Sequence, residues 1–177
     1  RRSDCNERRQ SMLNFFNPMH RMILEKEPNE GHRIIAELED EFEVAIITQN
    51  GDDFHERAGS TNIIHLHDEA LKNASTLHPY ESYEIDRNNP YICIGDKTPE
   101  DSQIRPYVIY FNEDIEQRLW KAPVEATKQA DMFIVVGSIM LVYPAAELLI
   151  MIPPKCNLYI IDPSMVTLPK GCTGEYI

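Results

Sequence analysis

The sequence has few cysteines and no long run of apolar residues. Four cysteines are scattered over its 177 residues, and no two of them form a C-x-x-C pair. Such spacing indicates neither a zinc clasp nor a disulfide framework, so we predict no bound metal. No stretch approaches the roughly 20 consecutive apolar residues that a membrane-spanning helix needs. Because we expect no signal peptide either, we predict a cytoplasmic protein.

The charge is strongly of one sign, because 17 basic residues stand against 29 acidic ones and leave a net charge of -12. Phosphate backbones and anionic lipid surfaces repel such a chain, so we expect no nucleic-acid or membrane partner. A basic partner, such as a lysine-containing peptide, suits this charge better. Hydrophobic residues make up 42% of the chain, which is enough for one well-buried domain with a small appendage.

Short apolar runs alternate with helical patterns along the chain. Strands are predicted at 44–47, 62–66, 107–111, 132–136 and 158–161. Helices are predicted at 12–24, with a kink or break at Pro18, and at 34–38, 53–58, 114–130 and 144–151. This order predicts an α/β fold, namely a Rossmann-like, mostly parallel sheet with helices on both faces.

Residues 69–104 differ from the rest, because they are polar and contain three prolines. Apolar and polar residues alternate at 80–85 and again at 91–94, which predicts a small antiparallel insert. We therefore predict two parts. Residues 1–68 and 105–177 form a Rossmann-like core, and residues 69–104 form the insert.

Polar and small residues follow the ends of the predicted strands. They are Gln49-Asn50, His67, Asn112, Gly137-Ser138 and Asp162. In a mostly parallel sheet the carboxyl ends of the strands share one edge, and ligands bind there. His65 and His67 have the spacing of a metal pair, but no third and fourth ligands converge on them, so we still expect no metal. The sequence therefore predicts a polar ligand site at this edge.

The same strand ends carry a series of motifs. In order they are TQNGDDFHERAG at 48–59, LH at 66–67, YVIYFNE at 107–113, GSI at 137–139 with VYPA at 142–145, and IDP at 161–163. These resemble the motifs T-Q-N-x-D-x-L-H-x-x-A-G, L-H-G, F-G-E, G-T-S and V-Y-P-A of the sirtuin family, which are NAD-dependent protein deacylases. Because they occur in the family's order across most of the chain, the resemblance is specific.

The resemblance implies an enzyme that transfers an acyl group from lysine to the ribose of NAD and releases nicotinamide. His67 matches the family's general base, a task that suits an imidazole which is neutral near pH 7. Asn50 would hold the ribose hydroxyls with Gln49 beside the same ribose, and Asp52 would accept from the nicotinamide carboxamide. We therefore predict NAD as the cofactor, and His67 and Asn50 as catalytic residues.

The resemblance also implies contacts farther from the reacting atoms. Gly137 and Ser138 would let backbone and hydroxyl groups approach the phosphate or ribose of the cofactor closely. Asp162 would accept from the adenosine ribose. An acyl-lysine protein or peptide is the implied partner, and in the family it docks by adding a strand between loops. The residues that match its border are Phe111, Asn112 and Glu113.

Several positions depart from the family's pattern. Gly51 replaces an apolar residue of the nicotinamide pocket, and Asp68 replaces the glycine after the proposed base. The charge of Asp68 should make His67 easier to protonate. Asn112 and Ile139 add bulk beside the peptide. The family's G-A-G-x-S loop is absent from the sequence, and we expect the chain to begin after it.

Two further departures concern zinc and the acyl group. Most sirtuins carry a four-cysteine zinc ribbon in the insert, whereas residues 69–104 contain Cys93 alone, as in the zinc-free bacterial sirtuins. Relatives that recognise succinyl or malonyl lysine carry a Tyr-x-x-Arg motif, and its two positions are Phe16 and Met19 here. Because no cation is available to pair with an acyl carboxylate, we predict a preference for neutral acyl groups.

Two other functions stay open on these residues. The first is an inactive sirtuin-fold binding protein, which the altered positions favour, whereas His67, Asn50 and Asp52 favour the deacylase. The second is an NAD glycohydrolase or ADP-ribosyl transferase. Residue types separate it poorly from a deacylase, since both reactions begin by cleaving nicotinamide from NAD.

Overall fold

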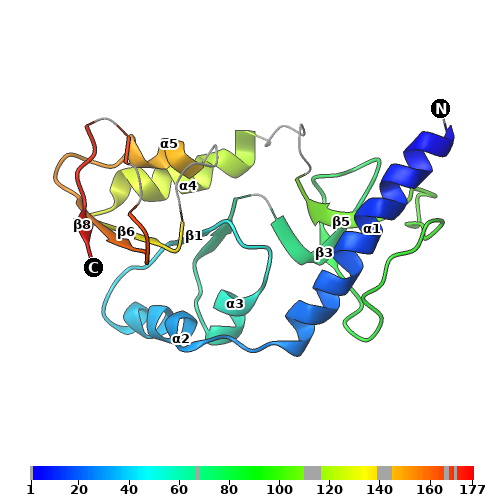
Figure 1. Ribbon diagram of the computed structural model, residues 1–177, viewed down its shortest axis with the longest axis horizontal. Helices are drawn as coiled ribbons and strands as arrows, with labels where there is room; N and C mark the ends of the chain where they lie inside the picture. Colours follow the sequence, from blue (N-terminus) through cyan, green and yellow to red (C-terminus); the bar gives the residue numbers. More distant parts are fainter. Residues whose placement is uncertain (1, 67, 110–116, 139–144, 166–167, 170) are drawn as a thin grey trace. The chain divides into compact units, whose positions relative to one another are not determined.

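The computed structural model describes residues 2–66, 68–109, 117–138, 145–165, 168–169 and 171–177. The chain forms two compact units, Arg1–Asp114 and Ile115–Ile177. The first contains α1 (Arg2–Glu25), α2 (Glu30–Glu37), the 3-10 helix η1 (Leu38–Asp40), β1 (Ile46–Thr48), α3 (Phe54–Ala58), β2 (Ile63–His65), β3 (Asp68–Ser75), β4 (Tyr83–Glu84) and β5 (Ile104–Val108) (Figure 1). The second contains α4 (Gln117–Gln129), β6 (Met132–Val136), α5 (Ala145–Leu149), β7 (Asn157–Ile161) and β8 (Glu175–Tyr176). The division into a core and an insert of residues 69–104 stays a prediction.

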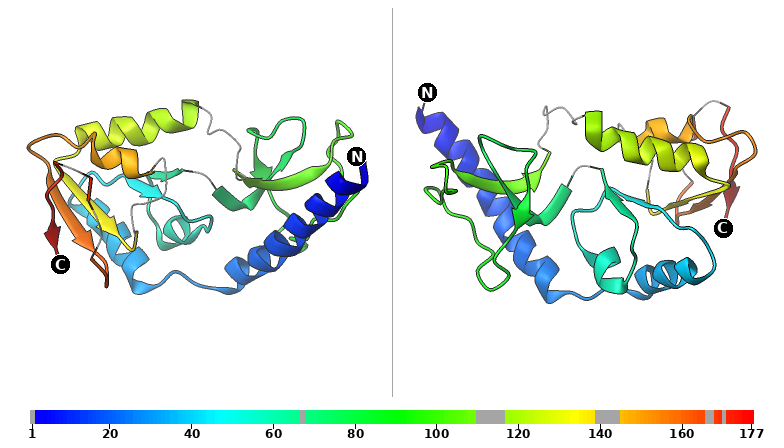
Figure 2. Two further views of the ribbon diagram at one scale, coloured as in Figure 1. Left: turned by 45° about the horizontal axis from the view of Figure 1, so that its top comes forward. Right: turned by 180° about the vertical axis from the view of Figure 1, so that it is seen from behind.

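Helix α1 lies along the antiparallel strands of the first unit (Figures 1 and 2). Ile23 of this helix packs against Ala70 and Leu71 of β3 and against Ile85, and all four side chains are buried. Met19, one turn earlier, packs against the same cluster. Full burial of a large apolar side chain contributes about 1.5–3 kcal/mol, so this cluster is the main attachment of α1 to the unit.

Of the kink or break predicted at Pro18, the break does not occur, since α1 continues through this residue. Contacts on both sides of the proline hold the helix. The side chain of Asn17 donates to the carbonyl of Ile92 and accepts from its amide, both at 2.9 Å. The Nδ1 atom of His20 donates to the carbonyl of Pro90 at 3.0 Å, and burial lowers the pKa of this ring. These contacts offset the backbone hydrogen bond that proline cannot donate.

Strands β1 and β2 confirm the two strands predicted at 44–47 and 62–66, and they pair in parallel. Their register places Thr48 beside His65, so the chain leaves both strands at the same edge. Helix α3 follows β1 as predicted and ends at Gly59, whose φ of 108° lies in the left-handed region. Glycine adopts this conformation without a clash at Cβ.

Strand β3 pairs antiparallel with both β4 and β5. The strand predicted at 107–111 therefore needs correcting, because β5 begins earlier, at Ile104, and does not extend a parallel sheet. Residues 91–94, also predicted as a strand, lie outside the strands. Strand β3 itself was not predicted, since its sequence DEALKNAS contains no β-branched or aromatic residue.

The second unit is built on the parallel sheet β6-β7-β8. Strands β6 and β7 confirm the predictions at 132–136 and 158–161. Its buried core consists of Val135, Leu158 and Ile160 from the sheet and Leu149 from α5. Helices α4 and α5 lie side by side over one face of this sheet (Figures 1 and 2). The unit thus combines parallel strands and helices as the predicted α/β class requires.

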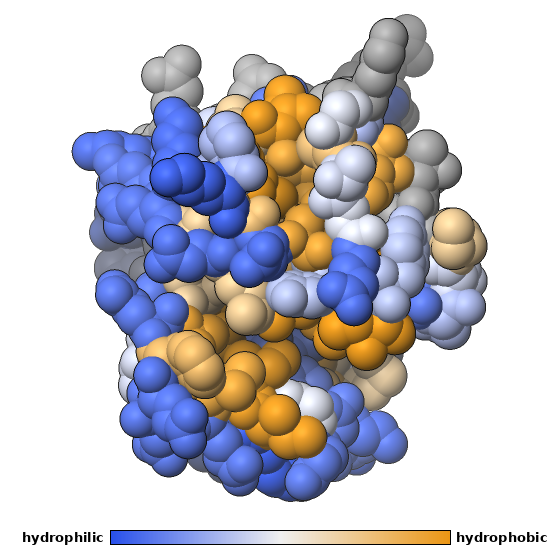
Figure 3. Space-filling view, turned by 90° about the vertical axis from the view of Figure 1, so that its left-hand side faces the viewer, coloured by the Kyte–Doolittle hydropathy of each residue, from blue (hydrophilic) through white to orange (hydrophobic). Residues whose placement is uncertain are grey.

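The pleat of β6 gives its two faces different surroundings. Val135 is buried, whereas Met132, Ile134 and Val136 on the alternate positions are 53%, 44% and 56% exposed. Figure 3 shows apolar side chains reaching the surface among hydrophilic ones. No helix in the described part of the chain is both long and apolar enough to cross a membrane.

Candidate active site

The chain leaves β1 in a turn that is fixed through its backbone. Thr48 is buried, and its carbonyl accepts from the amide of Leu66 at 3.0 Å. Its hydroxyl accepts from the amide of Asn50 at 3.1 Å. Of the two ligand residues predicted here, Gln49 is half-buried and Asn50 is exposed. The backbone of Asn50 is therefore held while its residue stays accessible to a ligand.

Asp52, the predicted nicotinamide ligand, lies in the turn that leads into helix α3. Its Oδ1 atom accepts from the amide of Phe54 at 3.2 Å, and this contact engages one of its two carboxylate oxygens. Just before it, the carbonyl of Gly51 accepts from the amide of Ala70 at 2.7 Å. The loop from Asn50 to Asp52 is thus attached to β1, to β3 and to α3 within a few residues.

Asp53, the residue after Asp52, connects α3 to Arg87 and, through Arg57, to the end of α1. The Asp53 side chain is 16% exposed and accepts from Arg57 at 3.4 Å and from Arg87 at 3.0 Å. Arg57 also donates to the carbonyl of Ile23 at 3.3 Å and to that of Lys26, at the end of α1. Neither arginine was predicted from the sequence. Arg87 is 34 residues from Asp53, and no local pattern connects them.

His65 links β2 to both the loop and α3. Its Nδ1 atom lies 3.2 Å from the carbonyl oxygen of Asn50, and its Nε2 atom lies 2.8 Å from a carboxylate oxygen of Glu56. Burial lowers the pKa of His65, but the hydrogen bond to Glu56 and the charges of Glu69 and Glu56 outweigh it, so the net shift is upward. Sequence reasoning considered His65 only as half of a metal pair and missed both partners.

His55 of α3 packs against α2. Its ring centroid is 4.7 Å from that of His32. Burial and then the charge of His32 lower the pKa of His55, against the raising effect of Asp52. A ring that is held neutral by packing is suited to fill the space between two helices.

In the second unit, the predicted cofactor residues follow two neighbouring strands. Val136 pairs with Ile161 in the parallel register, so Gly137 and Asp162 come next at the same edge. The amide of Gly137 donates to the carbonyl of Ile161 at 3.0 Å, and its φ of 58° is left-handed. One carboxylate oxygen of Asp162 accepts from the amide of Ser164 at 2.8 Å. Ser138, which follows Gly137, is half-buried.

Several predicted site residues lie outside the described residues. They are the proposed base His67 and the peptide-binding residues Phe111, Asn112 and Glu113. Their roles stay predictions, as does the effect of Asp68 on His67. In the part of the chain that the structure describes, no group of three or more His, Cys, Asp or Glu side chains is placed to hold a metal ion. The absence of a metal remains an expectation from the sequence.

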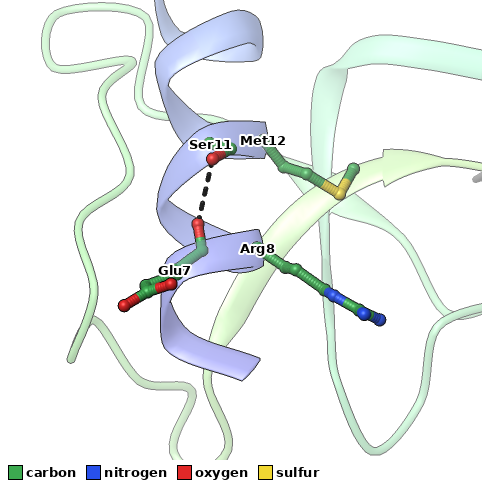
Figure 4. A pocket seen from close by; sticks show the side chains of 4 residues that line it. All are labelled: Glu7, Arg8, Ser11 and Met12. Carbon is green, nitrogen blue, oxygen red and sulfur yellow. Dashed lines mark hydrogen bonds between the residues drawn. The ribbon is translucent and has the colours of Figure 1, made fainter. Parts of the chain in front are cut away.

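A hollow on α1 is separate from the turn after β1. It is lined by Glu7, Arg8, Ser11 and Met12 on successive turns of this helix (Figure 4). The Ser11 hydroxyl donates to the carbonyl of Glu7 at 3.0 Å, within the helix itself. The residues that line this hollow belong to α1 alone, whereas the loop from Asn50 to Asp52 follows a parallel strand pair and is the candidate site.

Comparison with known proteins identifies the family. The sequence profile described as the Sir2 family matches residues 2–144. An NAD-dependent protein deacylase of Bacteroides thetaiotaomicron is 40% identical over 158 residues, covering 88% of this chain and 67% of that protein. One from Helicobacter pylori strain J99 is 39% identical over 170 residues, covering 94% of this chain and 70% of that protein. The chain belongs to the Sir2 family, and the predicted resemblance to sirtuins is confirmed.

Solved structures agree with this assignment. A mutant Sir2 homologue in complex with ADP-ribose has a TM-score of 0.83 and 29% identity, over 93% of this chain and 66% of that one. A Sir2 homologue in complex with NAD has a TM-score of 0.77 and 32% identity, over 87% of this chain and 60% of that one. These values confirm the Rossmann-like Sir2 fold. The chain spans about two thirds of the length of the relatives it matches.

Proposed function

We propose that this chain carries cofactor-binding and catalytic residues of an NAD-dependent protein-lysine deacylase of the sirtuin type. Membership of the Sir2 family and the names of the relatives support this function. The observation that carries it is the turn after β1. There Asn50 is exposed at the carboxyl edge of a parallel strand pair, with Asp52 two residues on and its loop held by β1, β3 and α3.

The residues at the strand ends fit NAD chemically. The carboxylate oxygen of Asp52 that is not bonded to Phe54 provides an acceptor for a carboxamide N–H, and Asn50 provides both a donor and an acceptor for ribose hydroxyls. In the second unit, no atom of the described residues, apart from Gly137 and its chain neighbours, lies within 4 Å of the position where a Cβ of Gly137 would lie. A phosphate can therefore approach its backbone closely, while Asp162 provides an acceptor for a ribose hydroxyl.

Bound NAD supplies a ribose carbon from which nicotinamide departs. In the overall reaction, the acyl group passes from the lysine nitrogen to a ribose hydroxyl, water supplies the oxygen and protons that balance the transfer, and free lysine, nicotinamide and O-acyl-ADP-ribose result. Asn50 orients the ribose hydroxyls, Asp52 holds the departing nicotinamide, and His67 accepts a hydroxyl proton as the general base. The orientation by Asn50 reduces the entropy that the reaction must otherwise lose.

The proposed function also includes a partner, a cellular location and the absence of zinc. The partner is an acyl-lysine protein or peptide, which suits a net charge of -12. The relatives include a Sir2 structure bound to an acetylated peptide, with 27% identity and a TM-score of 0.74. We propose that the protein is cytoplasmic, holds no zinc and has no nucleic-acid partner, for the reasons of cysteine spacing and charge given above.

The proposed reaction transfers a neutral acyl group. Met19 stands where some relatives place an arginine, and it packs against the apolar cluster of Ile23, Ala70 and Leu71. A thioether in that position gives a charged acyl group no ionic partner. An acetyl group carries no charge and therefore needs no ionic partner at this position.

Nicotinamide release from NAD, measured with and without an acetyl-lysine peptide, tests the function. We expect release that depends on the peptide and yields O-acetyl-ADP-ribose. Release that is independent of the peptide, with free ADP-ribose as product, would support the glycohydrolase instead. No release, with the wild type equal to His67→Ala, would leave only a binding protein.

A further inference from the structure

His65 is placed between two hydrogen-bond acceptors. Its side chain is 10% exposed. One ring nitrogen faces the carbonyl oxygen of Asn50 at 3.2 Å, and the other faces a carboxylate oxygen of Glu56 at 2.8 Å. A carbonyl and an ionised carboxylate can only accept, and a neutral imidazole carries a single N–H. A neutral ring would therefore leave one nitrogen lone pair facing an oxygen, so the geometry requires the doubly protonated ring.

The surrounding charges place the proton on the ring rather than on the carboxylate. Glu56 from α3 and Glu69 from β3 face His65, Glu69 itself pairs with Lys72 at 2.5 Å, and His55 from α3 lies within electrostatic reach. Burial raises the pKa of Glu56, but its hydrogen bond with His65 outweighs this and lowers it overall. Glu56 is thus ionised near neutral pH, and the imidazolium is its counter-ion.

This ring completes the restraint on Asn50. The amide of Asn50 is held by the hydroxyl of Thr48, and its carbonyl faces His65. The peptide groups on both sides of the Asn50 Cα are therefore fixed, and with them the direction in which its Cβ leaves the backbone. Among the described residues, His65 is the side chain that connects this carbonyl to α3 through Glu56.

We propose that His65, as an imidazolium bonded to the Asn50 carbonyl and the Glu56 carboxylate, is a positioning residue that orients Asn50 toward the ribose of NAD. This role rests on the proposed function. His65 itself does not touch the reacting atoms. It acts through the backbone of Asn50, and loss of its second proton releases either the loop or α3. The affinity for NAD should therefore fall as pH rises through the titration of this ring.

Two isosteric substitutions separate the two contacts of the ring. In His65→Asn the amide nitrogen replaces Nδ1 and still donates to the Asn50 carbonyl, whereas the contact with Glu56 is lost. In His65→Gln the amide nitrogen replaces Nε2 and still donates to Glu56, whereas the contact with Asn50 is lost. A hydrogen bond from a charged donor contributes about 1.5–3 kcal/mol. We therefore expect His65→Gln to raise the KM for NAD by about tenfold or more and to change kcat less.

His65→Asn should keep the KM for NAD within about threefold of the wild-type value at neutral pH and should abolish its rise at higher pH. His78→Gln serves as the control, because His78 is an exposed histidine whose side chain lies 4.0 Å from Glu81, away from the loop. A KM that rises equally in both His65 variants, or a pH dependence that survives in His65→Asn, would overturn the positioning role.

Nuclear magnetic resonance tests the protonation state without NAD or turnover. We expect the nitrogen shifts of His65 in the wild-type chain to show an imidazolium at pH 7, and the amide shifts of Asn50 and Gly51 to titrate with the same midpoint. A neutral single tautomer of His65 at pH 7, or loop amides that ignore its titration, would refute the proposal. A chain that passes this test but releases no nicotinamide would instead refute the proposed function.

Discussion

The carboxylate of Asp52 accepts a hydrogen bond from the backbone amide of Phe54 at 3.2 Å. The residue predicted to bind nicotinamide therefore also fixes the turn that leads into helix α3. Its position is set by the helix, so one carboxylate oxygen is engaged by the protein and the other stays available to a ligand.

This double role of Asp52 predicts different results for two substitutions. Asp52→Asn keeps an oxygen for the Phe54 amide but loses one acceptor, so it should leave stability unchanged and raise the KM for NAD by about tenfold. Asp52→Ala loses both the acceptor for nicotinamide and the hydrogen bond from the Phe54 amide, so it should also lower the free energy of unfolding by about 1 kcal/mol. Urea unfolding and steady-state kinetics on both variants measure these effects. Equal destabilisation by the two variants would contradict a structural role for the hydrogen bond between Asp52 and Phe54.

The pair formed by His65 and Glu56 predicts a pH dependence of stability. The pKa of His65 is raised in the fold from its ordinary value of 6.5, so its contribution is complete below pH 6.5 and is lost as pH rises through the folded pKa. The pKa of Glu56 is lowered from 4.5, so its contribution is complete above pH 4.5 and is lost as pH falls through its folded pKa. The pair therefore stabilises the fold most between these two values.

Glu56→Gln should reduce this pH dependence. The variant keeps an oxygen that accepts from His65 but loses the charge, so the loss of stability as pH rises from 6.5 through the folded pKa of His65 should become smaller than in the wild type. Because the Glu56 side chain is 41% exposed, we expect a difference of at most about 1 kcal/mol. Thermal unfolding across this range measures it, and parallel curves for the two proteins would contradict the ion pair.

The bridge made by Asp53 predicts non-additive effects. Asp53→Asn weakens the contacts with both Arg57 and Arg87, and it should lower the free energy of unfolding by about 1–2 kcal/mol. Arg87→Met removes only the more exposed partner and should have an effect below about 1 kcal/mol. In the Asp53→Asn background, Arg87→Met should then have almost no further effect. Urea unfolding of the four proteins forms the cycle, and additive losses would show that Arg87 acts independently of Asp53.

The surroundings of Met19 predict the acyl preference. We expect an acetyl-lysine peptide to be turned over at least about tenfold faster than the succinyl-lysine peptide of the same sequence, because no ionic partner replaces the lost hydration of a carboxylate. Met19→Arg should lower the ratio of acetyl-lysine to succinyl-lysine turnover, although it also disturbs the cluster around Ile23. Competition between the two peptides measures the ratio directly. Faster turnover of the succinyl peptide by the wild type would contradict the prediction.

The parts of the fold that sequence predicted well are those whose signal is local. Strand β6 is a continuous apolar run bounded by Asp131 and Gly137, and α3 is closed by Gly59, so both were found close to their true bounds. The strand-end position of Asn50 followed in the same way, because parallel strands such as β1 and β2 share one carboxyl edge.

The parts that were missed depend on partners distant in sequence. Helix α1 continues through Pro18, and its neighbours Asn17 and His20 contact residues that are 75 and 70 positions away in the sequence. The antiparallel pairing of β5 depends on β3, whose own residues are poor strand formers. His65 could not be assigned its role because neither Glu56 nor the Asn50 carbonyl leaves a recognisable spacing.

The proposed function requires a deacylase in which Asn50 and His67 act on NAD. Mass spectrometry of the products after incubation with NAD and an acetyl-lysine peptide tests it most directly, with Asn50→Ala and His67→Ala as the altered proteins and His78→Gln as the control. We expect O-acetyl-ADP-ribose from the wild type and the control, and a loss of about 100-fold or more in its rate of formation for His67→Ala. Equal amounts of product from wild type and His67→Ala, or ADP-ribose alone, would contradict it.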